Sequence, residues 1–109
     1  MTDKKTGDGV IVNQDIVDAI FTQHWMQFRI GPMIRVVEPH AYGVTHDGHH
    51  VIWAWNLIVA GSDPNVKAGW ERYRLDEMRD VQKLDEIFEG PRPDYTRANK
   101  TMRLTHAQL

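Results

Sequence analysis

The chain has 109 residues and a formal net charge of −2, which is the size of one domain with a single hydrophobic core. It contains no cysteine, so a disulfide framework, a cysteine-based zinc site and a thiol nucleophile are excluded. Residues 10–89 hold seven basic and twelve acidic side chains, whereas residues 90–109 hold four basic and one acidic. An acidic body argues against strong non-specific binding to nucleic acid, which needs a basic face.

Residues 1–9 lack an apolar export signal, and the longest apolar run, 51–60, is too short for a bilayer. We therefore expect a cytoplasmic protein with no membrane partner.

The first element that the pattern predicts is a helix over about residues 14–24. Asn13 is a good N-cap, and Ile16, Ala19 and Ile20 recur at helical spacing. We expect this stripe to pack on a sheet. Residues 1–9 are polar and lack periodicity, so we expect a mobile leader.

Two hairpins should follow. The runs 25–30 and 34–38 are rich in residues that favour strands and flank Gly31 and Pro32, which predict a turn. Pro39 should end the second strand, because proline cannot donate to a ladder. Residues 42–45 and 51–58 flank the second turn, which contains Asp47 and Gly48, and an Asp-Gly pair between apolar runs favours a hairpin. Both faces of 51–58 are largely apolar, as in a central strand.

The last strands are predicted over 70–75 and, after a corner at 76–78, over 79–84 with a helical turn at 85–88. A helix reaching residue 88 also fits the apolar spacing there. Residues 90–109 should form a flexible basic tail, which could serve as an interaction arm. Together these elements predict a mainly β (α+β) fold. Residues 10–89 should form a small five-stranded SH3-like or Sm-like barrel with one N-terminal helix.

Several short motifs follow one another in a distinctive order. After the predicted helix come Arg35, Val37, Glu38 and Pro39, then Tyr42 and Gly43, then a strand containing tryptophan. A later segment contains, in order, Trp70, Tyr73, Arg74, Leu75, Asp76, Met78 and finally Phe88. This ordered set resembles the WYL domain, and the resemblance covers about residues 14–95.

This resemblance implies an Sm-like barrel that usually follows a helix-turn-helix module in bacterial transcription regulators and binds a regulatory ligand, nucleotide or nucleic acid. Here we expect a free-standing version. Glu71 and Glu77 stand where the family usually has arginines, so two positive charges of the family's binding face become negative.

Arg35, Arg72 and Arg74, with Tyr42 beside them, are the candidate ligand-binding residues. Planar guanidinium groups on exposed strands can hold carboxylates, phosphates or stacked bases. The alternative is cross-strand pairing with neighbouring acidic residues, which contributes little when exposed.

Two further groups of residues have a functional and a structural interpretation. Large rings could stack on bases or fill the core; these are Trp25, Tyr42, Trp53, Trp55, Trp70 and Tyr73. Four histidines near the second hairpin could hold a metal ion or form a solvated turn; these are His40, His46, His49 and His50. We expect the solvated turn, with no metal and no cofactor.

Catalysis is not predicted. The chain has one serine, Ser62, outside any nucleophile elbow, and it has no phosphate-binding glycine loop. We therefore expect a non-enzymatic regulatory module for a small or nucleotide-like ligand or short nucleic acid. The alternative is an interaction domain that forms a homo-oligomer or contacts a regulator protein.

Overall fold

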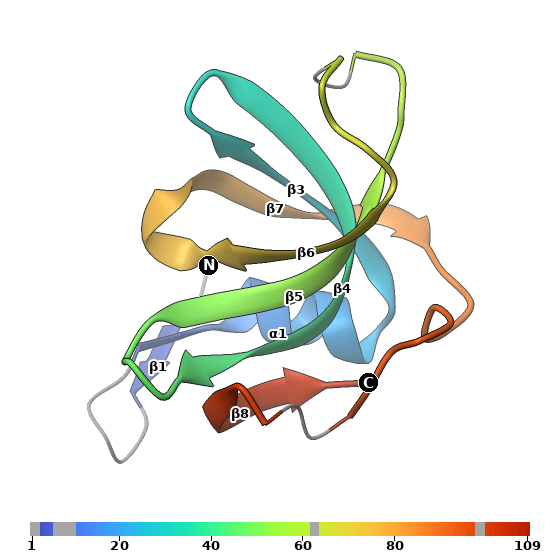
Figure 1. The fold of residues 1–109 in the computed structure, drawn as a ribbon. Coiled ribbons are helices and arrows are strands. Elements are labelled where there is room, and N and C mark those ends of the chain that lie inside the picture. The colour runs from blue at the N-terminus through green and yellow to red at the C-terminus, as the bar shows by residue number, and fades with distance from the viewer. Residues whose placement is uncertain (1–2, 6–10, 62–63, 98–99) are drawn as a thin grey trace.

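The computed structural model describes residues 3–5, 11–61, 64–97 and 100–109. They form one helix and a six-stranded antiparallel sheet in the order β6-β5-β4-β3-β7, with β8 paired to β4 (Figure 1). A separate two-stranded ladder joins β1 to β2. The elements are β1 (Asp3–Lys5), β2 (Ile11–Asn13), α1 (Gln14–Phe21), β3 (His24–Ile30), β4 (Met33–Thr45), β5 (His50–Leu57), β6 (Gly69–Arg74), the 3-10 helix η1 (Leu75–Glu77), β7 (Met78–Ile87) and β8 (Met102–Gln108).

Helix α1 begins as the sequence predicts. The side-chain oxygen of Asn13 accepts a hydrogen bond from the N–H of Ile16, which caps the first turn. The buried stripe is the expected one, Ile16, Ala19 and Ile20, and it packs into the core under the sheet. The helix ends before the expected position 24 because β3 already begins at His24.

Strand β4 organises the sheet because it changes partner along its length. On one side it pairs with β5 from Val36 to Val44. On the other side its first half pairs with β3, and its second half, from Ala41 to Thr45, pairs with β8. The prediction that Pro39 ends the strand is wrong. Pro39 lies at a register shift between the two halves, where a residue without an N–H is tolerated.

The two edges of this sheet come together at one end. Strands β6 and β7 are the outermost strands of the main path, yet only the three residues of η1 connect them. The sheet must therefore curl strongly, as Figure 1 shows. No ladder between β6 and β7 closes it among the described residues. The mainly β class is confirmed, but the five-stranded SH3-like barrel is not, because this sheet has six strands and is open.

Both predicted hairpin turns are present, and one predicted helical turn is not. Ile30 pairs with Met33 across the first turn, and the N–H of Gly48 donates to the carbonyl of Thr45 in the second. The helical turn expected at 85–88 is wrong. Strand β7 continues to Ile87 because its last residues pair with the start of β3.

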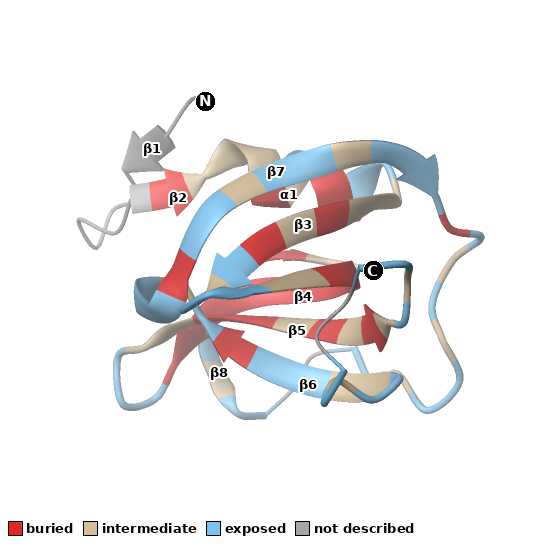
Figure 2. Cartoon of the chain, turned by 90° about the horizontal axis from the view of Figure 1, so that it is seen from above, coloured by how far each residue is buried: buried red, intermediate tan, exposed pale blue. Residues whose placement is uncertain are grey.

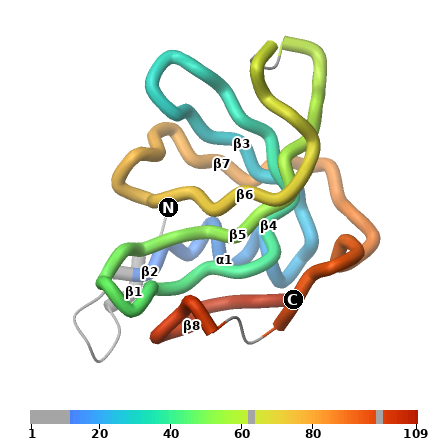
Figure 3. Tube along the Cα trace, viewed as in Figure 1, coloured from blue at the N-terminus to red at the C-terminus, as the bar shows by residue number. Residues whose placement is uncertain are grey.

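The chain ends are more ordered than the sequence indicated. Residues 102–108, expected in a flexible tail, form β8, which lies beside β4 after the chain has passed around the sheet (Figure 3, orange to red). This strand is hard to predict because it is mostly half-exposed and pairs with a strand far away in sequence. At the N-terminus, residues 3–5 of the expected mobile leader pair with β2; the rest of the leader lies outside the described residues.

The core lies between α1 and the concave side of the sheet, where the buried segments of β3, β4 and β5 meet (Figure 2). Phe28 and Tyr73 meet edge to face with ring centroids 4.8 Å apart. Tyr42 is fully buried, and its hydroxyl accepts a hydrogen bond from the N–H of Asn13. The core thus ties the start of the helix to β4.

Gly43→Ala should release β8 from the sheet. A Cβ at Gly43 would collide with the backbone oxygen of Leu104 and lie 2.8 Å from the sulfur of Met102. We expect a loss of about 1–3 kcal/mol in the free energy of unfolding, typical of overpacking, measured in urea. The amides of β8 should also lose hydrogen-exchange protection.

Gly31→Ala is the matched control for that substitution. Its Cβ would meet nothing within 4 Å, although its φ of 55° carries a left-handed strain of about 1 kcal/mol. Protection in β8 should be unchanged there. If the β8 amides of Gly43→Ala stay as protected as those of the control, the close packing of β4 and β8 is contradicted.

Candidate functional site

The candidate site lies on the face of β5 and β6 that points away from the core. The two strands pair Trp53 with Arg72 and Trp55 with Trp70. Because side chains alternate along a strand, these four share one face, whereas Tyr73 points into the core. The three tryptophans of this surface, which we call the tryptophan face, are half-buried.

The rings of the tryptophan face are packed against one another. Trp53 and Trp70 lie parallel, with centroids 5.9 Å apart and 4° between their planes. Trp55 meets Trp70 edge-on at 5.5 Å. Such contacts hold large rings in fixed orientations, so the face presents an ordered aromatic surface.

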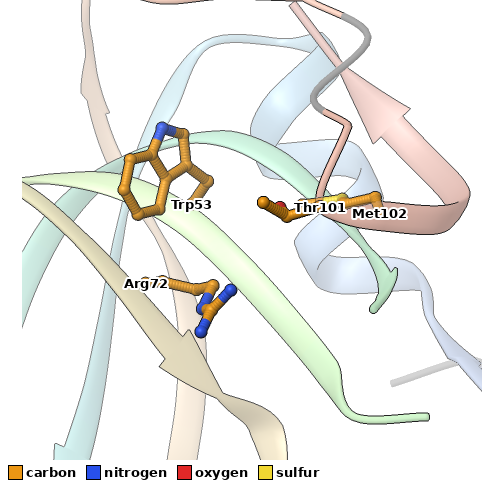
Figure 4. A pocket seen from close by; sticks show the side chains of 4 residues that line it. All are labelled: Trp53, Arg72, Thr101 and Met102. Carbon is orange, nitrogen blue, oxygen red and sulfur yellow. The ribbon is translucent and has the colours of Figure 1, made fainter. Parts of the chain in front are cut away.

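A cavity of about 400 Å³ opens beside this surface. It is lined by Trp53, Arg72, Thr101 and Met102 (Figure 4). The Arg72 side chain is exposed, and among the described residues none forms an ion pair with it. The carboxylate of Asp47 interacts with it only electrostatically. An aromatic ring, a guanidinium and a polarisable thioether therefore share one opening, a combination that suits a flat ligand with an anionic group.

The segment between β7 and β8 covers the other end of the tryptophan face. We call residues 88–95 the strap. Its Arg92 reaches the Glu38 carboxylate with Nε at 2.6 Å and Nη2 at 3.1 Å from the two oxygens. The same guanidinium lies 4.9 Å above the ring of Trp55. Glu38 raises the pKa of the Arg92 guanidinium by its hydrogen bonds, so the guanidinium stays charged.

His40 is fully buried beneath the strap. Its ring packs against Trp70 at 4.7 Å, Tyr95 at 5.1 Å and Phe88 at 5.4 Å. Burial lowers the pKa of His40, an effect partly opposed by its hydrogen bond to the Glu38 carbonyl. His40 is therefore a neutral hub that joins β4, β6 and the strap.

Tyr95 extends this packing toward the cavity. Its ring stacks on Trp70 at 6.0 Å, and its hydroxyl donates to the carbonyl of His40 at 3.2 Å. Burial raises the pKa of Tyr95 above its ordinary value of 10.0. The rings of Tyr95, Trp70 and Trp53 form one continuous series from the strap to the cavity.

The structure separates the four predicted site residues. Arg72 lines the cavity, but Arg74 is paired with Asp76 at 2.6 Å. Tyr42 lies in the core, out of reach of a ligand on the tryptophan face. Arg35 hydrogen-bonds to the hydroxyl of Tyr73, on the core side of the sheet. They do not form one binding site.

The Arg35 contact belongs to a polar network at the edge of the core. The Tyr73 hydroxyl donates to the side-chain oxygen of Asn56 at 2.5 Å, and the Asn56 amide donates to Glu71 at 3.1 Å. Burial raises the pKa of Tyr73 to about 12. Glu71 therefore lies on the opposite face of β6 from Arg72 and does not cancel its charge in the cavity.

The sequence alone did not identify the strap or the second wall of the cavity, which Thr101 and Met102 form. Glu38 and His40 were recognised only as a motif residue and as a metal candidate, and Arg92 only as part of a basic tail. The available signal was the pair Pro91 and Pro93 around Arg92, which predicts an extended segment. Thr101 and Met102 carried no signal of their own.

The hairpin histidines do not gather into a metal site. His46 contacts the backbone carbonyl of Lys100 at 3.0 Å, and His49 lies 3.6 Å from Asp47. His40 lies apart from the hairpin, beneath the strap, where its ring accepts a hydrogen bond from the N–H of Arg92. Within the described ranges, no group of three or more His, Asp or Glu side chains is placed to hold a metal ion.

Comparisons with protein-family models, with curated proteins and with solved structures find no match to this chain. Of the described residues, no helix is long and apolar enough to cross a membrane.

Removing the strap's cation should destabilise the fold. In Arg92→Ala the Glu38 carboxylate, whose side chain is 5% exposed, loses both hydrogen bonds from the guanidinium. We expect a loss of about 3 kcal/mol in the free energy of unfolding, the lower end for a broken buried pair, because Arg92 itself is partly exposed. Urea unfolding measures it.

Two further variants make this measurement specific. Arg79→Ala removes an exposed arginine of β7 and should cost less than about 0.5 kcal/mol. Adding Glu38→Gln to Arg92→Ala removes the unpaired carboxyl group and should restore part of the loss. An Arg92→Ala midpoint equal to that of Arg79→Ala would show that the pair holds nothing in place.

Proposed function

We propose that this chain is a non-enzymatic ligand-binding module of the WYL type, and that its ligand is a small planar molecule with one anionic group. The observation that carries this proposal is the cavity in which the ring of Trp53 and the guanidinium of Arg72 face the same opening. The ligand's ring would lie against Trp53, and its carboxylate or phosphate would contact Arg72.

The order of elements supports the WYL assignment. A helix is followed by five consecutive strands, β3 to β7, and a short η1 joins the last two. This is the element list of a small Sm-like barrel, and the connection through η1 brings the two sheet edges together at one end. We propose that the curled sheet is a barrel-like variant to which β8 has been added.

The charge around the cavity restricts the ligand. Arg72 is its one lining residue with a formal charge, and Arg74 is neutralised by Asp76. The body of the chain is acidic. A long nucleic acid would therefore gain little from phosphate neutralisation, whereas a mononucleotide or an aromatic carboxylate matches one ring and one cation.

Adenosine 5′-monophosphate and benzoate are suitable probes, followed by titration calorimetry and tryptophan fluorescence. We expect binding of at least one of them. Arg72→Gln should weaken it at least tenfold, about 1.4 kcal/mol, because a charge-assisted contact is lost. Trp53→Ala should weaken it by about 1–3 kcal/mol through the loss of stacking.

Arg79→Gln is the matched control, because Arg79 is an exposed arginine on β7, outside the cavity. It should leave the affinity unchanged. Arg72→Gln should also keep the unfolding midpoint of the wild type, since Arg72 is exposed. The proposal fails if neither probe binds, or if Arg79→Gln weakens binding as much as Arg72→Gln.

Self-assembly is a second candidate function, favoured by the edge position of β6. This strand pairs with β5 on one side and, among the described residues, with no strand on the other. Exposed edges can pair with a second chain. Sedimentation over a hundredfold range of concentration tests it: a concentration-dependent dimer supports assembly, and a monomer throughout rejects it.

A further inference from the structure

We infer that His40 is a pH-sensitive latch that holds the strap, residues 88–95, closed over the tryptophan face and releases it when the imidazole gains a second proton. The release follows from the geometry of the closed strap. Its effect on ligand binding rests on the function proposed above, because Thr101 and Met102, which line the cavity, follow the strap in the sequence.

The hydrogen bonds of His40 define its protonation state. The backbone N–H of Arg92 can only donate, and it points at Nε2 of the imidazole with a distance of 3.0 Å. Nε2 must therefore be an unprotonated acceptor. The proton is on Nδ1, which donates to the carbonyl oxygen of Glu38 at 2.8 Å. The closed strap thus requires the neutral Nδ1–H form.

A second proton would remove one of the contacts that hold the strap, the hydrogen bond from Arg92 to His40. It would sit on Nε2 and point at the N–H of Arg92, so an attractive hydrogen bond would become a contact between two donors. The imidazole is fully buried, so water cannot solvate the new charge while the strap is closed. Protonation and strap opening are therefore linked.

Other charged groups around His40 do not compensate for this loss. The Glu38 carboxylate would favour the imidazolium, but both of its oxygens already accept hydrogen bonds from Arg92. The Arg92 guanidinium opposes a second positive charge. Tyr95 faces His40 with a neutral hydroxyl that donates to the His40 carbonyl. The other rings that pack against His40, Trp70 and Phe88, carry no charge.

The direction of the pH effect follows from the states of His40. Burial lowers the pKa of His40 in the closed form below its ordinary value of 6.5, and opening returns the imidazole to solvent. Between these two values the open form binds one more proton than the closed form. The opening constant should therefore rise as the pH falls below about 6.5, by at most tenfold per unit, and should level off once the pH is below the lowered pKa of the closed form. Above about pH 6.5 it should be constant.

Opening of the strap would change the cavity in two ways. Tyr95 would leave the ring of Trp70, which is stacked on Trp53. The chain that follows the strap supplies Thr101 and Met102 to the cavity wall. Acid would thus loosen the ligand site without any titration of Arg72.

Hydrogen exchange of the Arg92 amide tests the latch directly, because this N–H is the group bonded to His40. Its exchange rate, divided by the intrinsic rate at each pH, gives the opening constant in the full-length wild-type chain between pH 7.5 and 5.0. We expect the protection of the Arg92 amide to fall below about pH 6.5, by at most tenfold per unit, while the amide of Val37 in the core keeps its protection. Constant protection of Arg92, or an equal loss at Val37, overturns the latch.

Two variants assign the effect to one histidine. His40→Gln keeps an oxygen that can accept from Arg92 but cannot titrate, so the pH dependence should disappear. His49→Gln removes a half-buried histidine of the hairpin and should keep the wild-type slope. If a folded His40→Gln shows the same pH dependence of Arg92 protection as the wild type, His40 is not the group that titrates. If that variant does not fold, the exchange measurements on the wild type still decide whether the strap opens in acid.

Adenosine 5′-monophosphate or benzoate, whichever binds, provides a separate measurement. Its affinity should fall between pH 7.5 and 5.5 in the wild type but much less in His40→Gln; an equal fall in both overturns the coupling to the cavity. If neither probe binds at any pH, the proposed function fails, while the exchange experiment still decides the latch.

Discussion

The buried ion pair between Glu38 and Arg92 is the interaction on which the outer face of this protein depends. A buried carboxylate without a partner is costly, and here a single arginine satisfies both oxygens. That arginine belongs to the connection between β7 and β8. The pair therefore attaches a long, irregular connection to β4 and positions the chain that enters β8.

Residues 38–40 of β4 explain why one face of the sheet is an apolar core and the other carries buried polar side chains. At Pro39 the strand loses β3 as a neighbour and then gains β8. Facing α1, the side chains are apolar and form a conventional core. On the outer face, Glu38 and His40 flank the proline and bind the strap, which covers part of the tryptophan face and leaves the end at Trp53 open.

Local signals were sufficient for much of the fold. The N-cap at Asn13, the helical stripe ending at Ile20 and the Asp-Gly turn at Asp47 each act over a few residues, so the sequence predicts them. The course of β4 through Pro39 and the existence of β8 depend on pairing between distant segments. No local pattern distinguishes such pairing from an extended loop or a polar tail.

The candidate site was predicted only in part, for a related reason. Period-two alternation identified Arg72 as an exposed cation, and the structure places it in the cavity. The same alternation cannot show which of two faces will be the core, so Arg35 and Tyr42 were grouped with Arg72 although they lie on the other face. Nor can it show that Asp76 neutralises Arg74. The second wall, Thr101 and Met102, comes from the segment whose strand could not be predicted.

We propose that the opening between Trp53 and Arg72 holds a small ligand in the cell. Native mass spectrometry of the protein purified from its natural host tests this most directly, with wild type and Arg72→Gln expressed side by side. We expect a co-purifying small molecule on the wild type that is absent or strongly depleted on Arg72→Gln. A ligand retained equally by both forms, or a wild-type protein that carries none and takes up neither mononucleotide nor aromatic carboxylate, would contradict it.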